Sequence, residues 1–445
     1  MTQIFDAALS GLQSIRVSHP CGHVASVRHG MLVVAGLQPT ARIGAQVRVQ
    51  TQGRAIEGEI VQVTETQTYV LIGENAEGIA VNDRVILTGI PEFAPSDRWI
   101  GRIIDPFGRP LDGKPLLRGS VPRPISAGAP AAADRRAMGA RLGTGLAVFD
   151  TLLPLARGQR IGLFSGSGVG KSRLLARMAR DIEADISVVA LIGERGREVS
   201  EFVRETLGED GLRRSVVVAA TSDQSALVRR RCAWAAMTIA EHFRDQGKQV
   251  LYLADSVTRF AEAQREIAAI SGEDLSLRGY PPSLTPSITA LCERAGPGMG
   301  DQGDITAIFT VLVAGSNMDE PVADVVRGVL DGHIILDRSI AERGRFPAID
   351  VLKSVSRALP GVASVHENDV IRDARALLGS YERSEVMIRA GLYSEGTDPQ
   401  LDRAVRAWPE LDAFFAKPTQ EDIAGSFNRL TLILRRAGAD VTGTR

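Results

Sequence analysis

The sequence has 445 residues, of which 44% are hydrophobic and 24% are charged. This is the composition of an ordinary soluble protein, and the length predicts more than one domain with a large core. The 52 basic and 53 acidic side chains give a net charge of −1, which argues against the basic footprint of a nucleic-acid binder or a membrane-surface protein. No apolar stretch approaches a membrane span or has signal-peptide form. We therefore expect a cytoplasmic protein that reaches a membrane only through a partner.

The three cysteines, Cys21, Cys232 and Cys292, lie far apart in the sequence. An odd and scattered set is typical of buried thiols in a reducing compartment rather than of a disulfide framework. His23 follows Cys21 closely, but no second pair follows at zinc-site spacing, so we expect no metal there.

The first stretch of the chain, residues 2–16, has the pattern of an amphipathic helix. Its apolar side chains share one helical face: Ile4, Ala8, Leu12 and Ile15. Ser10 and Gly11 weaken the helix, so it needs a surface to bury against. The pattern alone leaves two interpretations of residues 1–20 open, a helix that packs on the core and a docking segment for another protein.

Residues 21–92 change to short strands of alternating polarity. Glycines separate the strands: Gly30, Gly53, Gly58, Gly73 and Gly89. Many short strands with turn signals predict a small closed β-barrel. The polar stretch that follows is rich in proline from Pro91 to Pro124, which predicts a connector with an entry hairpin rather than a domain.

From about residue 137 to residue 356, apolar runs alternate with helical patterns, which predicts a mostly parallel sheet covered by helices. The runs are Ile161–Phe164, Ile186–Ile192, Val216–Ala220, Val250–Ala254, Ile305–Ala314 and His333–Leu336. Such sheets bind ligands at the carboxyl ends of their strands, so the residues directly after each run are the candidates for function.

The most informative stretch contains the first of these runs and reads RIGLFSGSGVGKSR, from Arg160 to Arg173. A strand, a glycine-rich turn and a helix start place several backbone N–H groups around one point, where the helix dipole favours an anion. This predicts a phosphate cradle in which Lys171 reaches the β- and γ-phosphates and Ser172 binds Mg²⁺. Ser165 departs from the consensus glycine, although three glycines remain in the turn. The predicted nucleotide-binding residues of this stretch are Ser167, Gly168, Val169, Gly170, Lys171, Ser172 and Arg173.

Two carboxylates follow later runs. Asp255 comes directly after Val250–Ala254, which is where the Mg²⁺-site carboxylate of a phosphate-loop enzyme belongs. Glu194 follows Ile192 closely and is the candidate base that orients the attacking water. Spacing alone leaves a plainer interpretation open, in which Glu194 and Arg195 belong to a surface ladder of ion pairs.

After residue 360 the pattern is helical, which predicts a C-terminal helical domain over residues 361–445. Later helical segments cover Leu401–Ala407 and Ile423–Leu434. The first segment has an apolar face made of Val370, Ile371, Ala374, Leu377, Leu378 and Tyr381. We expect the segments to be broken at Gly391, Gly396, Pro399, Pro409 and Pro418.

Together, the barrel, the phosphate-loop core and the helical tail resemble the rotary-type hexameric ATPases, which include the F-type synthase subunits. The most specific marker is PAID at residues 347–350 with Ser354 and Ser356, which fits the signature P-A-[IV]-[DN]-x-x-x-S-x-S. The stretches GLFSGSGVGKS, LIGERGREVSEF, ADSVTRFAEAQREIA, RGYPPS and DGHIILDR are most similar to the ATPase of type III protein export. That group serves the bacterial flagellum and the injectisome. The resemblance implies a RecA-like ATPase domain with its entry linker over residues 93–360.

The resemblance also implies ATP as the substrate, Mg²⁺ as the cofactor and a role for single positions. Lys171 matches the phosphate-loop lysine, and Ser172 matches the Mg²⁺ ligand of that loop. Glu194 matches the catalytic glutamate, and Asp255 matches the Mg²⁺-site aspartate.

Aromatic and basic positions complete the implied site. Arg195 and Arg259 match arginines near the phosphates, and Arg357 matches the arginine finger that reaches the nucleotide of the adjacent subunit. Phe346 sits at the aromatic position that stacks on adenine, and Tyr393 is a candidate second stacking residue.

A finger that acts between subunits predicts a homohexamer. Hydrolysis develops charge on the γ-phosphoryl oxygens, and a supplied arginine raises the rate by roughly 10³–10⁵. Because one chain carries the loop, the glutamate and the finger, a ring of identical subunits can be complete at every interface.

The leading hypothesis is an ATPase that energises protein export, and the sequences of the motifs quoted above favour the flagellum over the injectisome. The resemblance implies several partners: a regulator or stator protein docked on residues 2–16, the export gate, chaperones, unfolded export substrates, and peripheral contact with the inner membrane.

A catalytic F- or V-type subunit would share the active-site residues, but the 2–16 helix and the motif sequences argue against it. An aromatic content of 5% and a near-zero charge argue against a Rho-like RNA translocase, so we expect no nucleic acid. Glu194 together with Arg357 disfavours a pure nucleotide-binding scaffold.

Overall fold

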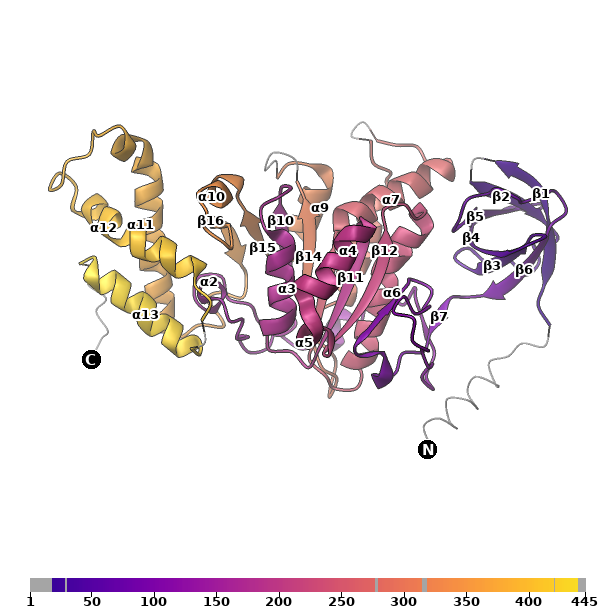
Figure 1. The fold of residues 1–445 in the computed structure, drawn as a ribbon, viewed down its shortest axis with the longest axis horizontal. Helices are drawn as coiled ribbons and strands as arrows, with labels where there is room; N and C mark the ends of the chain where they lie inside the picture. The colour runs from indigo at the N-terminus through magenta and orange to yellow at the C-terminus, as the bar shows by residue number, and fades with distance from the viewer. Residues whose placement is uncertain (1–17, 29, 277–278, 314–317, 420, 439–445) are drawn as a thin grey trace.

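The computed structural model has three parts in a row, a barrel at one end, a central sheet with helices, and a helical domain at the other end (Figure 1). It describes the chain except for residues 1–17, 29, 277–278, 314–317, 420 and 439–445. The predicted docking helix at residues 2–16 therefore lies outside the described residues. Among those residues, no helix combines the length and the apolar character needed to cross a membrane.

The N-terminal part is a closed antiparallel barrel with the strand order β1-β2-β5-β4-β3-β6, as the sequence predicts. In β3 the side chains of Val47 and Val49 are buried while those of Arg48 and Gln50 are exposed, so strict alternation fills the barrel with apolar groups. The strands are β1 Cys21–Arg28, β2 Met31–Ala35, β3 Gln46–Gln50, β4 Ala55–Val63, β5 Thr68–Ile72 and β6 Arg84–Gly89.

The proline-rich connector contributes more than the sequence indicates. Strands β7 Glu92–Phe93 and β9 Arg123–Pro124 form a short antiparallel pair. Between them, β8 Arg102–Ile104 joins the central sheet in parallel beside the strand Ser215–Thr221. Short 3₁₀ turns lie at Asp97–Trp99 and Ala132–Asp134.

The central sheet has the order β16-β15-β10-β14-β13-β11-β12-β8. All six predicted apolar runs form strands of this sheet, and every neighbouring pair is parallel except β15 and β16. The strands are β10 Arg160–Ser165, β11 Ile186–Glu194, β12 Ser215–Thr221, β13 Val250–Asp255, β14 Ile305–Leu312, β15 Gly332–Leu336 and β16 Ile349–Ser356.

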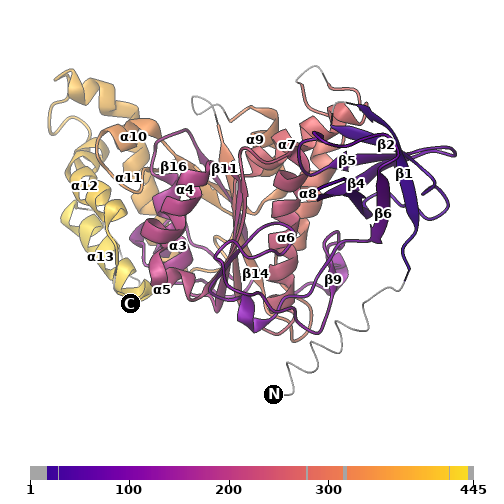
Figure 2. The same ribbon diagram turned by 45° about the vertical axis from the view of Figure 1, so that its right-hand side comes forward.

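Helices cover both faces of the sheet, with α3 and α5 on one side and α6, α7 and α8 on the other (Figure 2). Successive strand residues alternate between two cores, since Val189 packs with the α3 side and Val188 with the α6 side. The helices of this part are α2 Ala147–Asp150, α3 Lys171–Asp181, α4 Gly196–Glu201, a π-helical turn Phe202–Leu207, α5 Gly208–Leu212, α6 Ala226–Arg244, α7 Val257–Ile270, α8 Leu284–Arg294, α9 Pro321–Val329 and α10 Arg338–Glu342.

The C-terminal domain consists of α11 Val365–Arg389, α12 Pro399–Ala416 and α13 Ile423–Arg436. The apolar face predicted for the first segment is confirmed, because five of its six side chains are buried in the core and Tyr381 packs against it. The prediction that Pro409 breaks a helix is wrong, since Pro409 lies inside α12. Leu411, Phe414 and Phe415 are buried just beyond it, and we attribute the continuation of α12 to this packing.

Candidate functional site

The glycine-rich loop leaves β10 and turns into α3 through two glycines in the left-handed region, Gly168 with φ 78° and Gly170 with φ 86°. Side chains rarely adopt this conformation, so glycine is favoured at both positions. A Cβ on Gly170 would also lie 3.1 Å from Cδ1 of Phe346. The glycine therefore lets the aromatic ring of Phe346, which is 49% exposed, lie directly against the loop.

Ser165, which replaces the consensus glycine, is the last residue of β10 and pairs with Leu312. Because its backbone is ordinary strand, the departure from the consensus costs the turn nothing. Ser167 and Gly168 are exposed at the tip of the loop, whereas the Val169 side chain is buried in the core. Beyond the loop, the side chains of Ser172 and Arg173 are exposed in the first turn of α3.

Lys171 meets two carboxylates from neighbouring strand ends. Its Nζ forms a close ion pair with Oδ1 of Asp255 and lies 3.9 Å from Oε1 of Glu194. Asp255 ends β13 and Glu194 ends β11, so the parallel sheet brings together residues that are far apart in the sequence. The structure thus assembles the predicted lysine, base and Mg²⁺-site aspartate around one point.

Thr310 is a member of this cluster that the sequence interpretation missed. Its Oγ1 donates a hydrogen bond of 2.8 Å to Oδ1 of Asp255, and the residue is fully buried in β14. A polar residue within the apolar run Ile305–Ala314 was the available signal, because a buried hydroxyl requires a partner.

The Glu194 carboxyl is in an environment that favours its neutral form. Burial, first, and the nearby charge of Asp255, second, raise the pKa of Glu194 to about 7, while Lys171 opposes the shift. A carboxylate with a pKa near the working pH can accept and release a proton during a reaction, as a general base requires.

The two predicted arginines near the phosphates lie differently. Arg259, on α7, packs beside the end of β11, since a Cβ on Gly193 would lie 3.2 Å from Cβ of Arg259. Its Nη1 donates to Glu262 at 2.8 Å. The Arg195 side chain is 82% exposed and lies 3.7 Å from Glu198, so the surface ion-pair interpretation describes Arg195 but not Glu194.

Tyr393 lies between α11 and α12, where its hydroxyl donates a hydrogen bond of 2.7 Å to Oδ1 of Asp402. This bond is the first cause that raises the pKa of Tyr393 to about 12. Within the described part of the chain, none of the recorded contacts of Tyr393 involves the loop or Phe346, so the structure does not bring Tyr393 together with the other site residues.

Arg357 lies near the level at which the parallel strands begin, whereas the loop lies at their carboxyl ends, so the two are at opposite edges of the sheet. It follows β16, and its backbone N–H donates to the carbonyl of Asp331 at 3.0 Å. The strand register pairs His333 with both Gly162 and Val355. Because β16 runs antiparallel to β15, Arg357 is level with the start of β10 at Arg160. Along the strand direction it is therefore about five residue positions, or roughly 16 Å, from the end of β10. Its side chain is exposed and has no hydrogen bond or ion pair with any residue that the structure describes.

The two signature serines fix the strand that leads to Arg357. The Ser354 hydroxyl accepts from the Ile335 N–H at 3.0 Å, at the bulge between β15 and β16. The Ser356 hydroxyl donates to the Pro154 carbonyl at 2.6 Å and accepts from Gln159 at 3.0 Å. These serines are thus positioning residues, which the sequence signature marks without showing their purpose.

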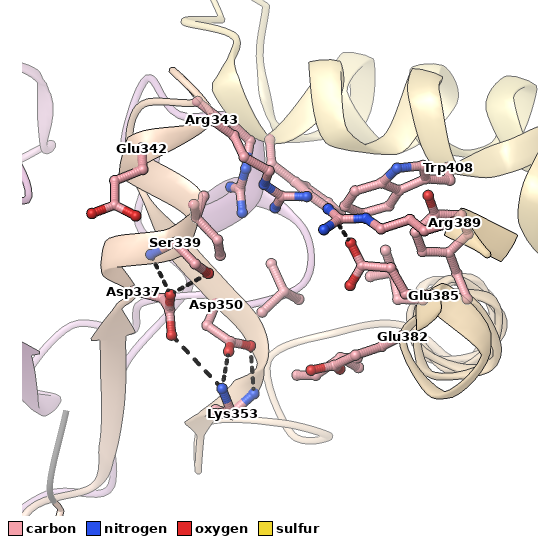
Figure 3. A pocket seen from close by; sticks show the side chains of 17 residues that line it. Asp337, Ser339, Glu342, Arg343, Asp350, Lys353, Glu382, Glu385, Arg389 and Trp408 are labelled. Carbon is pink, nitrogen blue, oxygen red and sulfur yellow. Dashed lines mark hydrogen bonds and ion pairs between the residues drawn. The ribbon is translucent and has the colours of Figure 1, made fainter. Parts of the chain in front are cut away.

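A cavity of about 480 Å³ lies between the end of the central sheet and the helices α11 and α12 (Figure 3). Several of its charged groups pair with one another, as Lys353 does with Asp350 at 2.9 Å and Arg389 with Glu385 at 2.7 Å. None of the predicted nucleotide-site residues lines it, so it is separate from the phosphate site.

A glycine-rich loop at a strand end, its lysine, and carboxylates on the neighbouring strands define a phosphate-loop nucleotide hydrolase. The family model "ATP synthase alpha/beta family, nucleotide-binding domain" matches residues 145–356, and the model "T3SS EscN ATPase C-terminal domain" matches residues 363–429. The chain therefore belongs to the ATP synthase α/β family, in the branch that contains the flagellum-specific and type III secretion ATPases.

Individual relatives cover nearly the whole chain. The flagellum-specific ATP synthase of Caulobacter vibrioides is 45% identical over 93% of this chain and 96% of its own length. The type 3 secretion system ATPase of Xanthomonas euvesicatoria is 40% identical over 92% of each chain. The structure of the assembled ATPase EscN from the type III secretion system of enteropathogenic E. coli has a TM-score of 0.85 at 36% identity, over 93% of this chain and 100% of that one.

Proposed function

We propose that this chain is one subunit of a homohexameric, Mg²⁺-dependent ATPase that drives protein export through a type III apparatus, that of the flagellum. The observation that carries the proposal is the division of the chemistry between two edges of one sheet. Lys171, Glu194 and Asp255 meet at one edge, and Arg357 is exposed at the other. Flagellum-specific relatives support the choice of the flagellum.

ATP binding begins at the start of α3, where backbone N–H groups and the helix dipole favour the phosphates. Lys171, which is paired with Asp255 here, turns to the β- and γ-phosphates when ATP enters. Phe346 offers an exposed ring beside Gly170 and stacks on the adenine.

The residues present fit a Mg²⁺ ion. Asp255 provides a carboxylate whose Oδ1 Thr310 holds in place, and Ser172 provides an exposed hydroxyl at the start of α3. One carboxylate and one hydroxyl are oxygen donors that Mg²⁺ accepts together with phosphate and water oxygens. When bound, the ion neutralises charge on the phosphates.

Glu194 is the base of the hydrolytic step. A water oxygen bonds to the γ-phosphorus as the bond between that phosphorus and the ADP oxygen breaks, and the proton of the water passes to the Glu194 carboxylate. Negative charge then develops on the γ-phosphoryl oxygens. Arg357 cannot reach the loop of its own chain across the sheet, so the Arg357 of an adjacent subunit stabilises this charge.

The biochemical test of the proposal uses purified full-length protein. ATP hydrolysis should require Mg²⁺ and should rise more steeply than linearly with protein concentration, because a complete site needs two subunits. Lys171→Ala should weaken ATP binding. Turnover that is linear in concentration at a concentration where the protein is demonstrably monomeric would contradict the shared site.

The export role has its own test. A strain that lacks this protein should regain swimming with the wild-type chain and not with Glu194→Gln. Restored secretion by an injectisome without an effect on swimming would correct the assignment to the flagellum, and stimulation of hydrolysis by RNA would instead support an RNA translocase.

We also propose that residues 2–16 bind the regulator that controls assembly, and that the protein works at the cytoplasmic side of the inner membrane, where it meets the export gate, chaperones and unfolded substrates. Deleting residues 2–16 should abolish regulator binding and leave hydrolysis intact or raised. If the deletion instead unfolds the barrel, the segment is part of the core.

A further inference from the structure

A second cavity, of about 370 Å³, lies where the barrel, the connector and α6 meet, and we call it the barrel–core cavity. The barrel also contacts the ATPase core directly, since Leu71 of β5 packs with Ala226 and Leu227 of α6. No residue of the nucleotide site lines this cavity. The charged residues that do so are Arg48, Arg109, Arg118, Arg231, Glu57 and Glu92.

Four guanidinium groups thus face only two carboxylates. Glu57 pairs with Arg48 at 3.0 Å and lies 3.8 Å from Arg109. Glu92 and Arg118 are exposed and have no ion pair within the described residues. The walls of the cavity therefore carry an excess of positive charge.

Arg231 is the most informative member of the group. It is 4% exposed, its Nε donates to the Pro106 carbonyl at 2.9 Å, and its guanidinium lies over the Phe107 ring at 4.7 Å. The neighbouring Arg230 pairs with Glu59 at 2.7 Å, but Arg231 has no carboxylate within ion-pair distance among the described residues.

The terminal N–H groups of Arg231 consequently have no acceptor in the part of the chain that the structure describes, and the residue lines the cavity. Burial lowers the pKa of Arg231 to about 10, and the more distant charges of Glu59, Asp105 and Glu57 oppose this shift. A guanidinium presents five N–H donors. Burial disfavours the charged guanidinium, and an anion in the cavity would supply the acceptors that its terminal N–H groups lack.

We propose that the barrel–core cavity binds a phosphate group, either as inorganic phosphate or as the terminal group of a small phosphomonoester. The planar guanidinium matches phosphate oxygens with paired hydrogen bonds. A phosphate with up to two negative charges also balances Arg118 and Arg231, the two cavity arginines without a carboxylate partner among the described residues. The bound anion joins the barrel, through Arg48, to α6 of the ATPase core, so it stabilises the seating of the barrel.

The test uses the full-length chain with its nucleotide site saturated by a non-hydrolysable ATP analogue and Mg²⁺, so that the γ-phosphate position is filled and added phosphate cannot bind at the phosphate loop. Inorganic phosphate is titrated in one arm and glycerol 3-phosphate in a second, each against sodium chloride of matched ionic strength. Calorimetry measures binding, and a fluorescence change that disappears when Trp99, which lines the cavity, is replaced by phenylalanine reports its location.

We expect saturable binding that Arg118→Gln and Arg231→Met each weaken by about tenfold or more, as the loss of a charge-assisted hydrogen bond predicts. Arg98→Gln is the matched control, because Arg98 is exposed beside Trp99 but does not line the cavity. If the buried change Arg231→Met prevents folding, Arg118→Gln at an exposed position decides the question. Tighter binding of inorganic phosphate identifies the product of hydrolysis as the source, and tighter binding of glycerol 3-phosphate identifies a metabolite.

Two results would overturn the proposal. One is the absence of any saturable signal beyond that of chloride. The other is saturable binding that both cavity variants leave unchanged, which would place the anion elsewhere on the chain.

Discussion

The side chains at the carboxyl ends of the parallel strands, which we call the carboxyl edge of the central sheet, are held differently from those at the opposite edge, where the strands begin. At the carboxyl edge, the groups that we propose act on phosphate pair with one another, as Lys171 does with Asp255 and Asp255 with Thr310. At the opposite edge beside β16, the backbone of Arg357 is held in place while its side chain stays without a partner in the described part of the chain. A site with internally paired groups can form in one subunit. We propose that the exposed side chain of Arg357, next to a fixed strand, serves a neighbouring subunit.

Removing the arginine should have the largest effect. Arg357→Ala should lower kcat by roughly 10³–10⁵, because transition-state charge on the γ-phosphoryl oxygens loses its partner. ATP affinity of the monomer should hardly change, since the loop is at the other edge. Arg338→Ala is a suitable control, because Arg338 is also highly exposed and forms a surface ion pair with Glu342. An equal loss in the control, or a large loss of ATP affinity, would count against a role between subunits.

The base at the carboxyl edge should matter next. Glu194→Gln keeps the shape of the side chain but cannot accept the proton, so kcat should fall by roughly 10²–10⁴. ATP should still bind, which equilibrium binding of a fluorescent ATP analogue measures. Normal turnover by this variant would remove Glu194 from the mechanism.

The pH profile sharpens the same point. Because the pKa of Glu194 is raised to about 7, the fraction of the reactive carboxylate rises as pH rises through this value. We expect kcat/KM to fall by about tenfold per pH unit below pH 7 and to level off above it. The residual activity of Glu194→Gln should lack this step, and an unchanged profile in that variant would show that another group titrates.

The smallest effect should be on stability, beside Arg357. Ser356→Ala removes the hydroxyl that serves both Pro154 and Gln159. Leaving the Pro154 carbonyl and one N–H of the buried Gln159 amide without this partner should lower the free energy of unfolding by about 1–3 kcal/mol. Denaturant unfolding measures it, with the exposed Ser394 changed to alanine as the control. A Ser356 variant as stable as that control would show that the serine does not fix β16.

Local chemistry made the carboxyl edge predictable from the sequence. The glycine-rich loop and the apolar runs are continuous segments, and parallel strands place their ends together by topology alone. Thr310 was missed because its partner Asp255 comes from another strand. Strand β8 was missed because three residues with a leading arginine give no periodic signal.

The opposite edge depended on long-range packing that no local pattern contains. Sequence resemblance suggested a role for Arg357, but its distance from the loop follows from the register of β16 against β15 and of β15 against β10. Tyr393 shows that a position suggested by sequence can lie elsewhere in the fold, since its hydroxyl bonds to Asp402 rather than contacting the nucleotide-site residues. Pro409 shows that buried neighbours can keep a helix intact where local propensity predicts a break.

The most direct test of the division between the two edges mixes two inactive subunits. Arg357→Ala lacks the finger but keeps the loop, and Lys171→Ala lacks the loop lysine but keeps the finger. In mixed oligomers some interfaces join an intact loop to an intact arginine, so we predict that ATP hydrolysis partly returns. Mixed oligomers that demonstrably form and yet stay inactive would contradict the account and make Arg357 a structural residue of its own subunit.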